Sequence, residues 1–162
     1  MALGLLCGLV VAALYLQAYL HRPYRPPQPL PFEHSTHTAA DKAAMPCQAC
    51  HSGAEQGAVA GLPPATTCLD CHRHILAQDP RLLPLHAAAD ADSPLYTGEP
   101  LRWQRAWPLP AHAHFHHAAH TAKYACERCH PTPDHESPHY MRDCLQCHRD
   151  EAAPTGCTTC HS

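Results

Sequence analysis

The sequence has few of the large apolar residues that fill an ordinary protein core. Its 162 residues include only 2 Phe and 2 Trp, against 18 Pro and 17 His. Much of the hydrophobic content of 45% is alanine, or belongs to a leucine- and valine-rich run in the first 20 residues. A small chain without a large apolar core needs additional stabilisation, from either disulfides or metal centres. We therefore expect one small domain or two very small ones after the N-terminal run.

Two further patterns are missing. Lys and Arg total 11 and do not cluster, and the net charge is −3 with histidines neutral, so nucleic acid is not an expected partner. No stretch alternates apolar and polar residues as a half-buried strand does. The predicted fold is therefore mostly irregular, with short α-helices and loops.

What the sequence does contain is the motif Cys-x-x-Cys-His, five times over. Two thiols at this spacing bond to the two vinyl groups on one edge of a porphyrin, and the adjacent histidine reaches the iron, which makes the motif the attachment signature of c-type haem. Five covalently bound haem c groups are predicted, and their porphyrins would form the core. The thioether cysteines would be Cys47, Cys50, Cys68, Cys71, Cys126, Cys129, Cys144, Cys147, Cys157 and Cys160. The proximal iron ligands would be His51, His72, His130, His148 and His161.

Disulfides and zinc are the competing interpretations of paired cysteines. Ten of the 11 cysteines lie in the five motifs, and a histidine follows every one of them. With histidine at about one residue in ten, five such histidines by chance have a probability on the order of one in 10^5, which favours the haem signature.

At the N-terminus the sequence predicts a membrane anchor followed by a spacer. Residues 1–20 carry no charge and would span roughly 30 Å as a helix, so we predict a transmembrane signal-anchor over 1–21. A cleaved signal peptide is the alternative; Cys7 fits a lipoprotein site badly, because Leu6 stands where a small residue is expected. Residues 22–31 form a proline-rich spacer. Since haem is attached after export, the haem domain is expected on the periplasmic side of a bacterial inner membrane.

An internal repeat divides the rest of the chain. Phe-x-His-x-x-His begins at Phe32 and again at Phe115, and haem motifs follow each copy. We expect a two-haem module over 32–78 and a three-haem module over 111–162. The connection over 79–110 holds Trp103 and Trp107, which we expect to cover a porphyrin face or a partner surface.

Phe-x-His-x-x-His followed by closely spaced haem motifs resembles the class III multihaem cytochromes c, of the c7 and c3 type. The resemblance implies haem-cored c7-like modules, in which the two histidines serve two successive haems and a later histidine serves the third. Carried over in motif order, the five distal iron ligands would be His34, His37, His117, His120 and His139.

Some assignments stay open at this point. Met141 is an alternative to His139, and His116 is an alternative to His117. We interpret the remaining candidates as loop or solvent-facing histidines: His74, His86 and His135.

A second resemblance covers Trp103 to His148, where Trp103, Leu109-Pro110, Phe115 and His117 keep the register of a segment in the membrane-anchored pentahaem subunit of alternative complex III. It implies a subunit of a quinol-oxidising respiratory complex that takes electrons from an iron–sulfur or quinol-site protein and passes them to a monohaem cytochrome c or an oxidase. Histidine on both sides of each iron leaves no open coordination site, so we expect an electron carrier and not an enzyme. A free-standing anchored shuttle to a reductase or a photosynthetic reaction centre is the main alternative, and a multihaem enzyme is the third.

Overall fold

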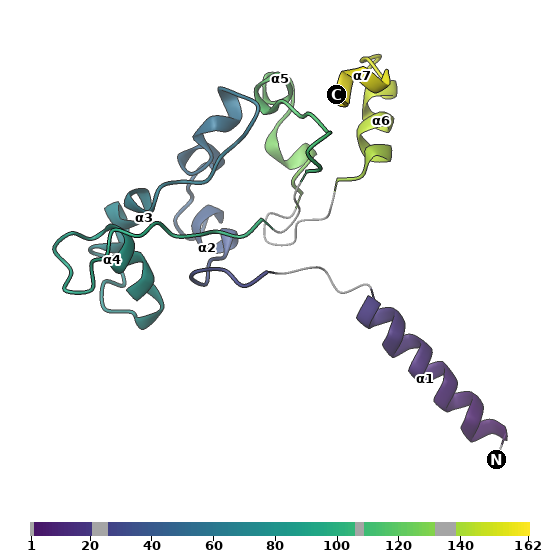
Figure 1. Ribbon diagram of the computed structural model, residues 1–162, viewed down its shortest axis with the longest axis horizontal. Helices are drawn as coiled ribbons and strands as arrows, with labels where there is room; N and C mark the ends of the chain where they lie inside the picture. Colours follow the sequence, from purple (N-terminus) through teal and green to yellow (C-terminus); the bar gives the residue numbers. More distant parts are fainter. Residues whose placement is uncertain (1, 21–25, 106–108, 132–138) are drawn as a thin grey trace.

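The computed structural model describes residues 2–20, 26–105, 109–131 and 139–162. Its helical elements are short apart from the first (Figure 1). In the N-terminal half they are α1 (Ala2–Leu20), α2 (His34–Thr38), η1 (Cys47–Ala49), η2 (Ser52–Glu55), α3 (Ala65–His72), η3 (Pro80–Leu82) and α4 (Leu83–Ala89). In the C-terminal half they are α5 (His117–Thr121), η4 (Cys126–Arg128), α6 (Met141–Asp150) and α7 (Cys157–Cys160).

The expected lack of strands holds for the described part of the chain. Its extended pairing there is an isolated antiparallel bridge between Ala113 and His161. Prolines help to delimit the short helices, since Pro46 and Pro64 are extended residues immediately before η1 and α3, and proline cannot continue a preceding helix. The irregular, short-helical fold predicted from the sequence is therefore confirmed.

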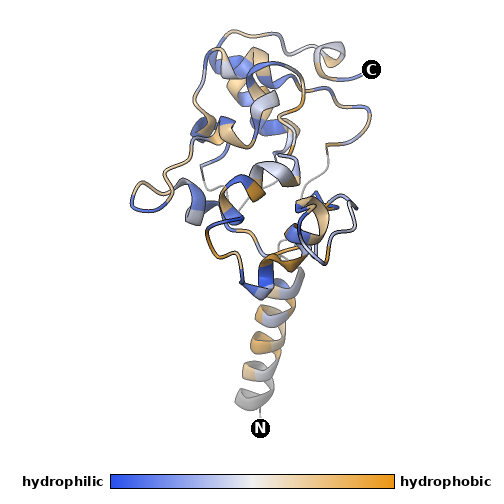
Figure 2. Cartoon of the chain, turned by 90° about the vertical axis from the view of Figure 1, so that its left-hand side faces the viewer, coloured by the Kyte–Doolittle hydropathy of each residue, from blue (hydrophilic) through white to orange (hydrophobic). Residues whose placement is uncertain are grey.

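The helix α1 projects away from the haem-motif segments (Figures 1 and 2). Its described side chains run from Cys7 to Tyr19, and every one is exposed. No helix within the described residues is long and apolar enough to cross a membrane. The transmembrane helix predicted over 1–21 is therefore not supported by the described residues.

The described hydrophobic core is very small. It centres on Leu30, Leu69 and Leu85, which are 8%, 2% and 1% exposed. Leu69 comes from α3 and Leu85 from α4, so these two helices pack together, with Trp103 against their edge. This cluster supports the second haem motif, because α3 carries Cys68, which packs against it.

The exposed surface is much larger than a chain of this mass normally shows. The accessible area is 12,336 Å², whereas a folded monomer of 17.7 kDa is expected to expose about 8,000 Å². Part of the excess comes from the projecting α1, and the rest lies on short helices that share little apolar core. Five porphyrins between these helices would supply the missing interior.

One buried polar cluster lies beside the second motif, and it corrects the interpretation of His86 as a loop or solvent-facing histidine. His86 on α4 and Asp90, the residue just after α4, are each 8% exposed, and the Nδ1 of His86 lies 3.0 Å from a carboxylate oxygen of Asp90. Arg73, the residue after His72, lies 3.2 Å from the other oxygen. The hydrogen bond from His86, and then the charge of Arg73, hold the pKa of Asp90 below its ordinary value. The cluster ties α4 to the end of α3.

Candidate haem sites

Each motif forms a turn that brings its histidine back over its first cysteine. The backbone N–H of His51 donates to the carbonyl of Cys47 over 2.9 Å, and His130 and His161 repeat the bond at 2.8 and 2.9 Å. The motif of His72 lies within α3 and that of His148 within α6. One helical turn thus places both thiols and the imidazole on one side, as attachment to a single porphyrin requires.

The proximal imidazoles are held by backbone carbonyls. The Nδ1 of His51 lies 2.7 Å from the carbonyl oxygen of Gly61, and that of His72 lies 3.1 Å from the carbonyl oxygen of Ile75. The Nδ1 of His148 lies 2.6 Å from the carbonyl oxygen of Pro154, and that of His161 lies 3.2 Å from the carbonyl oxygen of His112. A histidine that donates from Nδ1 to a carbonyl presents Nε2, with its lone pair, to a metal. The ring orientation and tautomer of these four histidines therefore suit iron ligation.

The two Phe-x-His-x-x-His segments adopt almost the same geometry. Phe32 meets His34 edge-on at 5.0 Å between ring centres and stacks on His37 at 4.6 Å. Phe115 meets His117 edge-on at 4.8 Å and stacks on His120 at 4.4 Å. The second histidine of each pair also bonds through Nδ1 to the carbonyl four residues before it, at 3.1 Å in α2 and 2.9 Å in α5. The phenylalanine therefore fixes both histidines of each helix.

Three distal candidates face their expected proximal partners. The ring centres are 6.2 Å apart for His34–His51, 6.1 Å for His37–His72 and 6.2 Å for His120–His148. Metal–imidazole bonds of about 2 Å, the length found at zinc, put two ring centres about 6 Å apart on either side of one ion. The spacing at these three pairs accommodates an iron between the rings, so the residues fit haem.

The two remaining sites are arranged differently from the pattern that the resemblance implies. His139, expected opposite His161, lies 5.3 Å from His130 between ring centres. His161 instead has the ring of His112 beside it at 5.5 Å. The carbonyl oxygen of His112 lies 3.2 Å from the Nδ1 of His161, so the backbone of His112 would orient this proximal candidate.

His117, expected opposite His130, begins α5 and has its Nδ1 2.9 Å from the carbonyl oxygen of Ala58. Its Nε2 is therefore the nitrogen available to iron. His117 and His139 are thus both candidates for the third haem.

The alternatives weighed from the sequence have distinct surroundings. Met141 begins α6 and is 63% exposed. His116 precedes α5, its carbonyl accepts from His120, and His74 is exposed. Trp107 and His135 lie outside the described residues.

The structure joins none of the described cysteines in a disulfide. All are free in the structure, and no group of three His, Cys, Asp or Glu gathers as a metal site within the described residues. Burial raises the pKa of the Cys68 thiol, with a smaller contribution from Cys50, and burial also raises the pKa values of Cys129 and Cys144.

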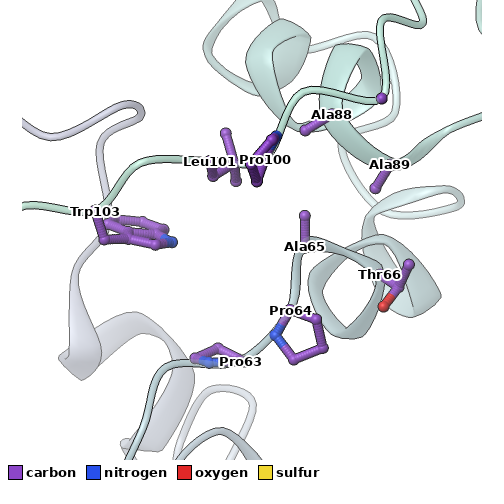
Figure 3. Close-up of a pocket in the computed structure, with 10 residues that line it drawn as sticks. Pro63, Pro64, Ala65, Thr66, Ala88, Ala89, Pro100, Leu101 and Trp103 are labelled. Atoms are coloured by element: carbon purple, nitrogen blue, oxygen red, sulfur yellow. The ribbon is translucent and has the colours of Figure 1, made fainter.

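An apolar pocket lies beside the second haem motif (Figure 3). Its volume is about 250 Å³, and Ala65 of α3, Ala89 of α4 and Trp103 are among its lining residues. The other face of this region carries Phe32, whose ring meets Trp103 edge-on at 6.1 Å. Trp103 therefore links the pocket to the Phe32–His37 stack of the second site.

No protein-family profile matches the chain. It is 33% identical over 132 residues to the multihaem cytochrome c subunit of menaquinone reductase from Nitratidesulfovibrio vulgaris (strain Hildenborough). The match covers 79% of this chain and 56% of that protein, so the chain spans little more than half the length of this relative. Together with the five attachment motifs, this similarity supports a multihaem cytochrome c with covalently bound haem.

Proposed function

We propose that the chain binds five haem c groups and relays electrons between partner proteins in a quinone-linked respiratory complex. The observation that carries this proposal is the spacing of the three histidine pairs, at 6.1 to 6.2 Å between ring centres. An iron held between two imidazoles has no free position for a substrate, and it cycles between oxidation states with little rearrangement. Such a centre conducts electrons and carries out no chemistry on a small molecule.

The proposed ligand set follows the repeat. The proximal ligands are the five motif histidines, and His34, His37 and His120 face three of them. His117 and His139 complete the distal set. When bound, the haems supply the reversible one-electron couple, while the protein contributes covalent attachment, ligand orientation through Nδ1, and an enclosing apolar environment.

The relative's name supports the quinone link. That protein is a subunit of menaquinone reductase, which favours transfer toward a quinone, whereas the resemblance to alternative complex III favours transfer away from a quinol. In both settings the partners would be other electron-transfer subunits, such as an iron–sulfur or quinone-site protein and a monohaem cytochrome.

We further propose a periplasmic location with α1 as the attachment to the membrane or to a membrane subunit. Leu9, Val10, Leu14 and Leu16 of this helix are 51% to 68% exposed. Aliphatic side chains so exposed on one projecting helix require cover from lipid or from another protein. Attachment of haem after export places the remainder of the chain in the periplasm.

A tagged protein purified from membranes in mild detergent tests this proposal. We expect mass spectrometry to find a membrane-spanning subunit and an iron–sulfur subunit in stable stoichiometry with the cytochrome. Replacing α1 by a cleavable signal peptide should release a soluble protein that keeps all its haems. A native preparation that is monomeric and fully loaded with haem would contradict the subunit assignment and favour the free shuttle.

A further inference from the structure

The two haem modules are joined by backbone contacts between η2 and α5. The N–H of Ala118 donates to the carbonyl of Gly57 over 2.9 Å, and the N–H of His117 donates to that of Ala58 over 3.3 Å. The hydroxyl of Thr121 donates to the carbonyl of Ala54 over 3.0 Å. The first N–H groups of a helix have no partner within the helix, so the loop after the first haem motif supplies the partners for the start of α5.

The same loop orients a ligand of the other module. The Nδ1 of His117 lies 2.9 Å from the carbonyl oxygen of Ala58, the arrangement that directs Nε2 toward a metal and makes the imidazole more basic. In α2, the matching helix of the repeat, the hydroxyl of Thr38 donates to the carbonyl of His34 over 3.0 Å, whereas the hydroxyl of Thr121 in α5 reaches the carbonyl of Ala54 in the other module.

Cysteines of the two modules also meet at this junction. Cys47 lies close to Cys126, and after burial its charge is the next cause that raises the pKa of the Cys126 thiol. Each thiol would bond to a vinyl group on one edge of its porphyrin. The first and third haems therefore have adjacent attachment edges.

The other neighbours follow from the helices. Phe32, just before α2, contacts both His34 and His37, which face the first and second motif histidines. In α5, His117 and His120 occupy one helical turn, with His120 facing His148 of the fourth motif and His117 a candidate ligand for the third haem. The carbonyl oxygen of Pro154, three residues before Cys157, lies 2.6 Å from the Nδ1 of His148, which keeps the fourth and fifth motifs close together.

We infer that the five haems form an unbranched series in the order His72, His51, His130, His148 and His161, and that electrons cross between the modules at the haems of His51 and His130. This order differs from the order of the motifs along the chain, since the second haem is a terminus and the first is internal. The inference rests on the proposed relay function. It identifies the haem on His72, beside Trp103, as one end of the path.

Removing single haems tests the order. A variant with Cys47→Ala and Cys50→Ala should lose the first haem, and its partner with Cys68→Ala and Cys71→Ala should lose the second; intact mass confirms four haems in each. Exchange NMR on partly reduced protein then measures electron transfer among the remaining haems. We expect transfer between the haem on His72 and the other three to slow by orders of magnitude in the first variant, and the four haems of the second variant to stay in fast exchange.

Fast exchange of the second haem in the first variant would overturn the order, because that haem would then contact another directly. Fast exchange among all five haems of the unmodified protein checks the relay itself, so failure of the relay and failure of the order give different results.

If a variant that lacks a haem does not accumulate, two glycines of the loop provide a second test. A Cβ at Gly53 would lie 2.5 Å from the carbonyl oxygen of Val59 and 2.9 Å from that of Ala60, whereas at Gly57 it meets only the oxygen of Gly53, at 4.0 Å. Gly53→Ala should displace the loop, weaken the bond between His117 and Ala58, and raise the potential of the third haem, since its ligand becomes less basic. Gly57→Ala should leave all five potentials unchanged. Equal potentials in Gly53→Ala and the unmodified protein would contradict the inferred junction.

Discussion

The chain made without haem should not fold. Four hydrophobic side chains are buried among the described residues, Leu30, Leu69, Leu82 and Leu85. The exposed area of 12,336 Å² exceeds the roughly 8,000 Å² expected for a folded chain of this mass. A core of this size cannot offset the conformational entropy that folding removes, so the haems have to supply the interior.

The test is to replace the ten motif cysteines by alanine and to follow thermal unfolding by circular dichroism. We expect no cooperative transition and rapid proteolysis, whereas Cys7→Ala, outside the motifs, should behave as the unmodified protein does. A cooperative transition in the chain without haem would show that the polypeptide has a core of its own.

Removing one distal histidine should leave one haem iron with a free coordination position. We expect the unmodified reduced protein not to bind carbon monoxide, and His34→Ala to bind one molecule per chain, because the ring that faces His51 at 6.2 Å would be gone. The oxidised variant should show one high-spin haem by EPR, and added imidazole should restore the low-spin form. His74→Ala, which removes an exposed histidine outside the pairs, is the matched control.

Carbon monoxide binding by the unmodified protein at one haem per chain would contradict the ligand set and favour a multihaem enzyme. His139→Ala addresses the two sites where the structure and the c7 pattern differ. His139→Ala is combined with Cys157→Ala and Cys160→Ala, which remove the fifth haem. If the combined variant has no high-spin haem, His139 is the distal ligand opposite His161. If a high-spin haem remains, His139 is the distal ligand opposite His130, beside which it lies.

Local sequence patterns predicted the features that depend on residue type and spacing. Cys-x-x-Cys-His specifies a turn and a cofactor, and Phe-x-His-x-x-His predicted a repeat whose two copies have matching ring geometry at Phe32 and Phe115. The docking of α5 on the loop at Ala58 could not be predicted, because the acceptors there are backbone carbonyls of alanine and glycine, which carry no compositional signal.

Two other features depended on distant parts of the chain. The buried pair of His86 and Asp90 has the spacing of neighbours on a helix, yet nothing in the sequence indicates that α4 packs against α3. The surroundings of His139 likewise depend on how α6 follows η4, so the c7 pattern alone predicted a partner other than the one that lies nearest.

The central claim is that five haems are bound covalently and form the interior of this protein. Its most direct test is the intact mass of the denatured native protein, which retains thioether-linked haem and loses metal ions and loosely bound groups. The account predicts the mass of the polypeptide plus five haems. A mass with fewer than five haems would contradict it. So would the mass of the polypeptide alone, which is expected if the cysteines form disulfides or bind zinc that is lost on denaturation.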